Sequence, residues 1–219
     1  MKKNLIRLIF SALVSAFFTL LISCDCNISL KLLNKADGKV SLNVSFSGTC
    51  GEAFQEMLLF ALANGEANSA SSAFEAFDTT EISNQLKNAG FSSVLVTANG
   101  PKLEINMEDS DCKTFLFTSG LLEEASNELK INLSKAKLKA FYDSCDEELQ
   151  MLLDLFLSPA FNDEAMNVAE YEEMIGYVYG LRMQEEINSS KINISITNAD
   201  GKSRKKTISL SQLLCGLDF

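Results

Sequence analysis

The chain has 219 residues, among which 29 are acidic, 19 are basic and none is histidine. The net charge of −10 argues against a nucleic-acid-binding protein, because such proteins carry a basic surface. The absence of histidine excludes Ser-His and Cys-His catalytic pairs, and no metal or other cofactor is expected.

The N-terminal residues have the layout of a secretory signal. Three basic residues come first, and an apolar stretch follows over 8–22. This stretch is shorter than the about 20 apolar residues that a membrane helix needs. We therefore expect a signal peptide over 1–23 and a single exported domain over 24–219. Two sub-modules, 27–108 and 109–219, remain an alternative division of that domain.

The apolar stretch closes with Leu21-Ile22-Ser23-Cys24. This tetrapeptide resembles the lipobox of bacterial lipoproteins. The resemblance implies that Cys24 carries the lipid and becomes the first residue, and that the domain lies in the cell envelope outside the cytoplasm. Removal of 1–23 leaves 29 acidic and 16 basic residues, a net charge of −13, which argues against electrostatic docking on anionic lipid.

Alternating apolar and polar residues predict three β-hairpins. They cover 27–47, 94–107 and 192–210, and each contains a dipeptide that favours a tight turn: Asp37-Gly38, Asn99-Gly100 and Asp200-Gly201. Pro101 lacks a backbone N–H, so the strand that follows it is expected at a sheet edge. The first and last turns look alike, which shared turn chemistry explains better than a duplicated module.

Apolar residues at helical spacing predict helices over 50–63, 79–89 and 135–157, and a further helix that begins near Asn167. Thr49 and Glu52 have the spacing of a capping box for the first of them. The periodic stripe of the long helix makes Leu149 and Leu152 candidate core residues. Between these elements, a short strand at 115–117 and a short helix at 119–128 are expected.

These elements predict an α+β fold, in which antiparallel hairpins form a sheet packed by amphipathic helices. The last two helices are expected to form a C-terminal αα-hairpin over 135–187. The order of elements over 27–108 is similar to that of the modules behind other lipoprotein anchors, including the LppM-type proteins.

Five cysteines follow Cys24, and an exported compartment permits disulfides. An odd number leaves at least one cysteine unpaired within the chain. Disulfide pairing and burial as small apolar side chains are both open for these residues, which are Cys26, Cys50, Cys112, Cys145 and Cys215.

Two patterns bear on catalysis. Ser134 and Lys137 fit the Ser-x-x-Lys motif of penicillin-binding proteins, but the companion motifs of that family are missing or misplaced. An N-cap serine followed by a solvated lysine explains the pair better. A cluster of carboxylates is better explained by a charged helix entrance than by a cation site, and its members are Asp163, Glu164, Glu170, Glu172 and Glu173.

We therefore predict no catalytic residue and no metal ligand, and a lipoprotein that binds a partner or ligand or helps to assemble the envelope. An envelope hydrolase that uses carboxylates or a Ser-Lys pair is the alternative. The partners expected are the membrane, through the lipid, and an envelope protein or an apolar ligand. The binding surface is expected on a sheet edge or on the αα-hairpin, where the candidate residues are Phe141, Tyr142, Tyr171, Tyr177 and Tyr179.

Overall fold

The computed structural model describes residues 23–36, 38–62, 79–132, 135–144, 150, 154 and 166–215. The signal-peptide residues 1–22, the predicted core residues Leu149 and Leu152, and Cys145 lie outside this part of the chain. Within it, the strands form a six-stranded sheet in the order β3-β4-β2-β1-β7-β8 and a separate β5–β6 hairpin.

The strands of the large sheet run over the bounds β1 (Ser23–Asn34), β2 (Val40–Cys50), β3 (Ser92–Asn99), β4 (Lys102–Asp109), β7 (Lys191–Thr197) and β8 (Ser203–Ser209). The small hairpin consists of β5 (Leu122–Ala125) and β6 (Glu128–Ile131). The helices are α2 (Glu52–Leu62), α3 (Thr79–Asn88), α4 (Phe115–Thr118), α5 (Lys135–Ser144), α7 (Val168–Tyr179), α8 (Leu181–Ser189) and α9 (Leu210–Leu214).

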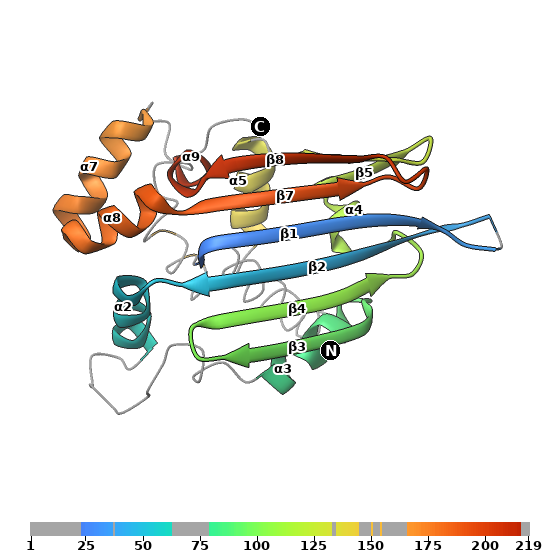
Figure 1. Cartoon of the computed structure of the whole chain (residues 1–219), viewed down its shortest axis with the longest axis horizontal. Coiled ribbons are helices and arrows are strands. Elements are labelled where there is room, and N and C mark those ends of the chain that lie inside the picture. The colour runs from blue at the N-terminus through green and yellow to red at the C-terminus, as the bar shows by residue number, and fades with distance from the viewer. Residues whose placement is uncertain are drawn as a thin grey trace.

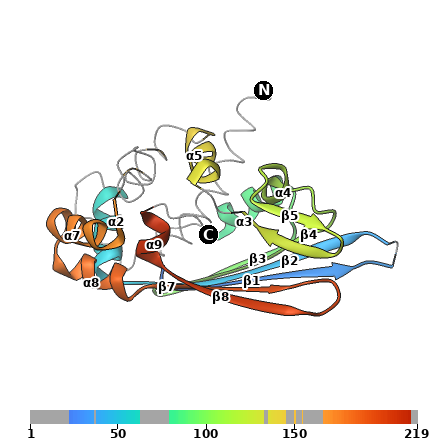
Figure 2. The ribbon, with the colours of Figure 1, turned by 90° about the horizontal axis from the view of Figure 1, so that it is seen from above.

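The described elements lie in layers. Helices α3, α4, α5 and α9 and the small hairpin cover one side of the large sheet, as Figure 2 shows. Helices α2, α7 and α8 gather at one end of it (Figure 1). The α+β prediction is confirmed, including a C-terminal pair of helices.

The three predicted hairpins are confirmed as the antiparallel pairs β1–β2, β3–β4 and β7–β8. Their turns contain Gly38, Gly100 and Gly201, whose φ angles of 80°, 56° and 83° suit a residue without a side chain. The edge position predicted from Pro101 is wrong, because β4 pairs with both β2 and β3. Pro101 lies in the turn, where no ladder bond needs its N–H, and its carbonyl accepts a 2.9 Å hydrogen bond from the Cys50 N–H.

Strands β1 and β7 pair in parallel, with Asp25 opposite Lys191 and Lys31 opposite Thr197. This pairing joins the first hairpin to the last one in a single sheet. It also places the start of β1 at the same end of the sheet as the start of β7. That end is where α8 leads into the sheet, because only Ser190 separates the two elements.

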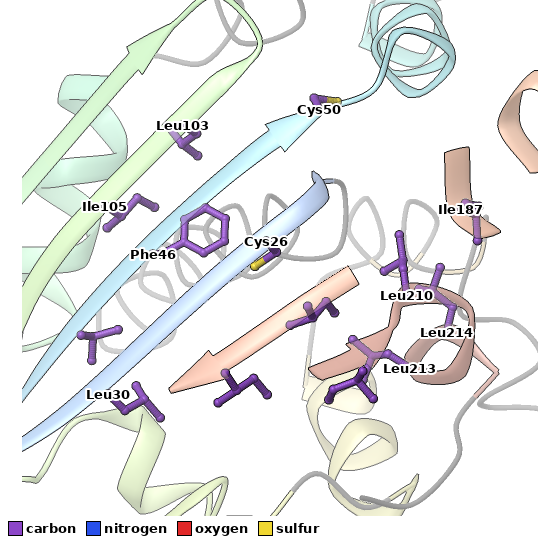
Figure 3. Packing of buried hydrophobic residues seen from close by; sticks show 14 of the residues in the cluster. Cys26, Leu30, Phe46, Cys50, Leu103, Ile105, Ile187, Leu210, Leu213 and Leu214 are labelled. Atoms are coloured by element: carbon purple, nitrogen blue, oxygen red, sulfur yellow. The ribbon is translucent and has the colours of Figure 1, made fainter. Parts of the chain in front are cut away.

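The core lies between the sheet and the elements that cover it. Alternate residues of each strand point to this side, among them Cys26, Leu30, Phe46 and Ile105, which are all buried (Figure 3). Helix α9 was not predicted and adds a largely apolar helical turn, whose buried apolar side chains are Leu210, Leu213 and Leu214. Alternation of buried and exposed residues therefore fixes which face of the sheet meets the helices.

The segment after β4 differs from prediction. The expected strand at 115–117 is helix α4, and the expected helix at 119–128 is replaced by the β5–β6 hairpin. Ser126 and Asn127 form its turn with φ of 56° and 65°. The glutamates around them favour a helix by propensity, but two adjacent residues in the left-handed region are typical of a tight hairpin turn.

Helix α7 begins as predicted at N-cap Asn167, which forms a capping box with Glu170. The helix does not continue to about residue 187. Gly180, with φ 92° and ψ 164°, ends it and starts α8, so the described C-terminal helix pair is α7 and α8. Of the predicted helix 135–157, the described residues are Lys135–Ser144, Gln150 and Asp154, all helical.

Candidate binding surfaces

The five aromatic residues predicted for binding do not form one surface. Tyr171 is fully buried in the core, and burial raises the pKa of its hydroxyl. Tyr142 and Tyr179 are half-buried, whereas Tyr177 is 94% exposed. The side chain of Phe141 lies outside the described part of the structure. Only Tyr177 of the described four is therefore available as a protruding contact.

The residues considered for catalysis have structural roles where the structure describes them. Lys137 donates a 2.9 Å hydrogen bond to the Ser119 carbonyl, while Ser134 lies outside the described residues. Glu170 belongs to the capping box of α7. Asp163 and Glu164 are also outside the described residues. Within the described ranges, no cluster of three or more Cys, Asp or Glu side chains could hold a metal ion.

Three of the four cysteines whose side chains the structure describes are buried. Cys26, Cys50 and Cys215 are buried, and the Cys112 thiol donates to the Val40 carbonyl at 3.8 Å. Burial raises the pKa of the Cys112 thiol to about 11, and the nearby carboxylates of Asp109, Glu124 and Asp111 add to this shift. Cys26, Cys50 and Cys215 therefore match the expectation of small buried side chains, whereas Cys112 is only half-buried.

The face of the large sheet that points away from the helices is exposed and polar. Figure 2 shows no described helix or strand on this side. The outward residues in the middle of β1, β2, β4, β7 and β8 form what we call the polar face, which consists of Asn27, Ser29, Asn43, Ser45, Ser47, Glu104, Asn106, Asn193, Ser195, Lys205 and Thr207. The sequence shows the same residues as the polar positions of its alternating strands, but their concentration at the centre of one sheet depends on the strand order.

A depression of about 560 Å³ lies on the polar face. Eight of its fourteen lining residues carry a hydroxyl or carboxamide group, and only Glu104, Lys205 and Lys206 are charged. In a chain with 48 charged residues, this is a nearly neutral, hydrogen-bonding surface. It lies on the face of the sheet, whereas the sequence led us to expect a sheet edge or the αα-hairpin.

Hydrogen bonds connect three side chains across this depression. The Thr207 hydroxyl donates to the Asn193 carboxamide oxygen at 2.9 Å. The Asn193 carboxamide nitrogen donates in turn to the Asn27 carboxamide oxygen at 3.2 Å. The three residues lie in one row, since Asn193 is opposite both Asn27 and Thr207. The row continues through Ser47 to Glu104 on β4.

A second, apolar surface lies at the turn between α7 and α8. Tyr177, Val178 and Leu181, which we call the apolar turn, are 94%, 60% and 72% exposed. Beside them a recess of about 520 Å³ opens between this turn and α2, where Met57 and Met183 contribute to its lining. Large apolar side chains that gather at an exposed position are typical of an interaction site.

Comparison of the chain with protein-family models, with curated proteins and with solved structures found no match. Among the helices that the structure describes, none is both long and apolar enough to cross a bilayer.

Proposed function

We propose that the chain is a lipid-anchored protein of the bacterial cell envelope that works by binding, and that the polar face is its binding surface. The row formed by Thr207, Asn193 and Asn27 carries this proposal. Because these side chains hold one another by hydrogen bonds, their donors and acceptors have fixed directions before a ligand arrives. A surface ordered in advance loses less conformational entropy on binding.

The lining of the depression defines the chemistry of the ligand. Hydroxyl and carboxamide groups from five neighbouring strands suit a neutral ligand rich in hydrogen-bonding groups, and the few charges leave little to attract a strongly ionic one. An open depression that crosses several strands suits an extended or polymeric ligand more than a small molecule, which usually occupies a deep and largely apolar pocket.

The position of Cys24 in the fold determines how the proposed anchor would hold the domain. Cys24 is the second residue of β1, so cleavage before it would make the lipidated residue part of the central region of the sheet. No linker would then separate the lipid from the fold. The domain would stay close to the membrane, and its ligand would have to be found there.

The hydrolase alternative gains no support from the described carboxylates. Asp109 is buried, and its carboxylate accepts hydrogen bonds from the backbone N–H groups of Asp111, Lys113 and Thr114. Glu186 accepts hydrogen bonds from the first turn of α2. These two carboxylates stabilise the local backbone by accepting its hydrogen bonds. This structural role favours the binding proposal over a hydrolase that would use them for acid–base chemistry.

Lipidation is tested by the intact mass of the protein extracted from membranes. We expect the loss of residues 1–23 and a mass increment from the diacylglyceryl and acyl groups. Cys24→Ser should abolish the increment and membrane retention. Cys26→Ala, which removes the neighbouring cysteine of the same strand, should leave both unchanged. An unmodified wild-type mass would contradict the anchor.

Binding is tested by affinity capture from the envelope of the source cell with three full-length proteins. The first is the wild type, and the second combines Asn27→Ala, Ser45→Ala and Asn193→Ala on the polar face. The third combines Thr97→Ala and Asn99→Ala, which are exposed on the edge strand β3. Only the second protein should lose the captured material. Equal capture by all three, with equal melting curves, would contradict a role for the polar face.

A further inference from the structure

We propose that the apolar turn between α7 and α8 is a second membrane contact, which inserts into the headgroup region and orients the domain on the bilayer. This inference rests on the proposed lipid anchor at Cys24. The anchor alone would leave the domain able to rotate about one attachment point. A second contact would fix which way the polar face is turned.

The first argument is position. The start of β1 and the start of β7 lie at the same end of the sheet, because Asp25 pairs with Lys191 in a parallel ladder. Helix α8 joins β7 at this end, and the apolar turn lies at the opposite end of α8. Figure 1 shows α7, α8 and α2 extending beyond the sheet on the side from which β1 begins. A membrane that holds the lipid of Cys24 is therefore also the nearest large surface to the apolar turn.

The second argument is chemistry. Tyr177 combines an apolar ring with a hydroxyl, and tyrosine is enriched at the interface between lipid and water. Val178 and Leu181 supply apolar side chains that can enter the acyl boundary, as interfacial helices do to a depth of about 5–10 Å. The recess beside Leu181 adds the apolar side chains of Met57 and Met183, next to the ion pair of Arg182 with Glu56.

The third argument is charge. The protein is strongly acidic, but Arg182 is the only charged residue between Glu173 and Glu185. The nearest carboxylates on α2 pair with it, since Arg182 lies 3.3 Å from Glu52 and 3.4 Å from Glu56. The apolar turn therefore presents little negative charge to lipid phosphates. The overall charge opposes electrostatic adsorption, but this contact is local and apolar.

The chain contains no tryptophan, so a single introduced tryptophan reports its own surroundings. Tyr177→Trp places the reporter on the apolar turn. Leu95→Trp is the matched control, because Leu95 is an apolar residue on edge strand β3 that is 58% exposed. Each lipidated full-length protein is reconstituted into phosphatidylethanolamine and phosphatidylglycerol vesicles with and without brominated acyl chains. We expect a blue shift and strong quenching by bromine for the reporter at 177, and neither for the reporter at 95.

A third protein adds Val178→Asp and Leu181→Asp to Tyr177→Trp and should lose the quenching while it remains attached through its lipid. Three results would overturn the inference. The first is a vesicle-bound protein whose reporter at 177 is no more quenched than the one at 95, which leaves the anchor intact. The second is shielding that appears only after envelope proteins are added, which identifies a protein partner. The third is an intact mass without lipid, which removes the anchor as well.

Discussion

The Glu186 carboxylate of α8 accepts a 2.7 Å hydrogen bond from the backbone N–H of Ala53 in the first turn of α2. Its second oxygen accepts from the Phe54 N–H at 3.1 Å. A carboxylate at this place also interacts favourably with the helix dipole. The predicted capping box of Thr49 and Glu52 is wrong, because Thr49 lies in β2 and α2 begins only at Glu52. Glu52 pairs with Arg182.

We expect Glu186→Ala to destabilise the protein by about 1–2 kcal/mol, because it leaves two N–H groups of α2 without their charged acceptor. For a domain of this size, the melting temperature should fall by roughly 2–4 °C for each kcal/mol. Glu185→Ala is the control, since Glu185 is exposed on the same helix. Calorimetric melts of the two variants should differ clearly. Equal melting would show that water replaces the cap without loss.

The Glu186 contact illustrates what the sequence could not show. The contact joins residues 133 positions apart, as the parallel pairing of β1 with β7 joins the two ends of the chain. By contrast, the three hairpins were predictable because alternation and turn dipeptides are local signals. The capping box at Asn167 was predictable for the same reason. Local sequence signals thus predict the individual elements. The polar face depends on the order of the strands in the sheet, which those signals do not give.

Asp109→Ala should destabilise the protein more than Glu186→Ala does. The Asp109 carboxylate is buried and serves three backbone N–H groups, from Asp111 to Thr114, at 2.9–3.2 Å. Loss of the acceptor leaves the buried Thr114 N–H unsatisfied, which costs about 1–3 kcal/mol, and removes two part-buried hydrogen bonds as well. Urea denaturation should show a lower midpoint with a similar slope. Asp111→Ala, which alters an exposed neighbour, should change the midpoint little, and a larger effect there would contradict this assignment.

Gly180 should tolerate neither alanine nor asparagine. A Cβ at this position would meet no atom within 4 Å, so any cost arises from the backbone alone. The combination of φ 92° and ψ 164° lies in a region that is essentially restricted to glycine, and occupying it costs another residue of the order of 1–3 kcal/mol. Thermal melts should therefore show similar losses for Gly180→Ala and Gly180→Asn. Full rescue by asparagine would indicate an ordinary left-handed conformation instead.

The Cys112 thiol should react slowly with alkylating agents at neutral pH. Burial and neighbouring carboxylates raise its pKa from 9.0 to about 11, and only the thiolate is a good nucleophile. The fraction of thiolate, and with it the labelling rate of the peptide that contains Cys112, should rise with pH and reach half of its maximum near pH 11. Asp111→Asn removes one negative charge near the sulfur, so it should move this profile to lower pH. Site-resolved mass spectrometry after timed labelling measures both profiles.

Protein unfolded in guanidinium is the control and should label with the ordinary cysteine pKa, near 8.5. A folded profile that coincides with the unfolded one would mean that the thiol is neither buried nor subject to these carboxylates.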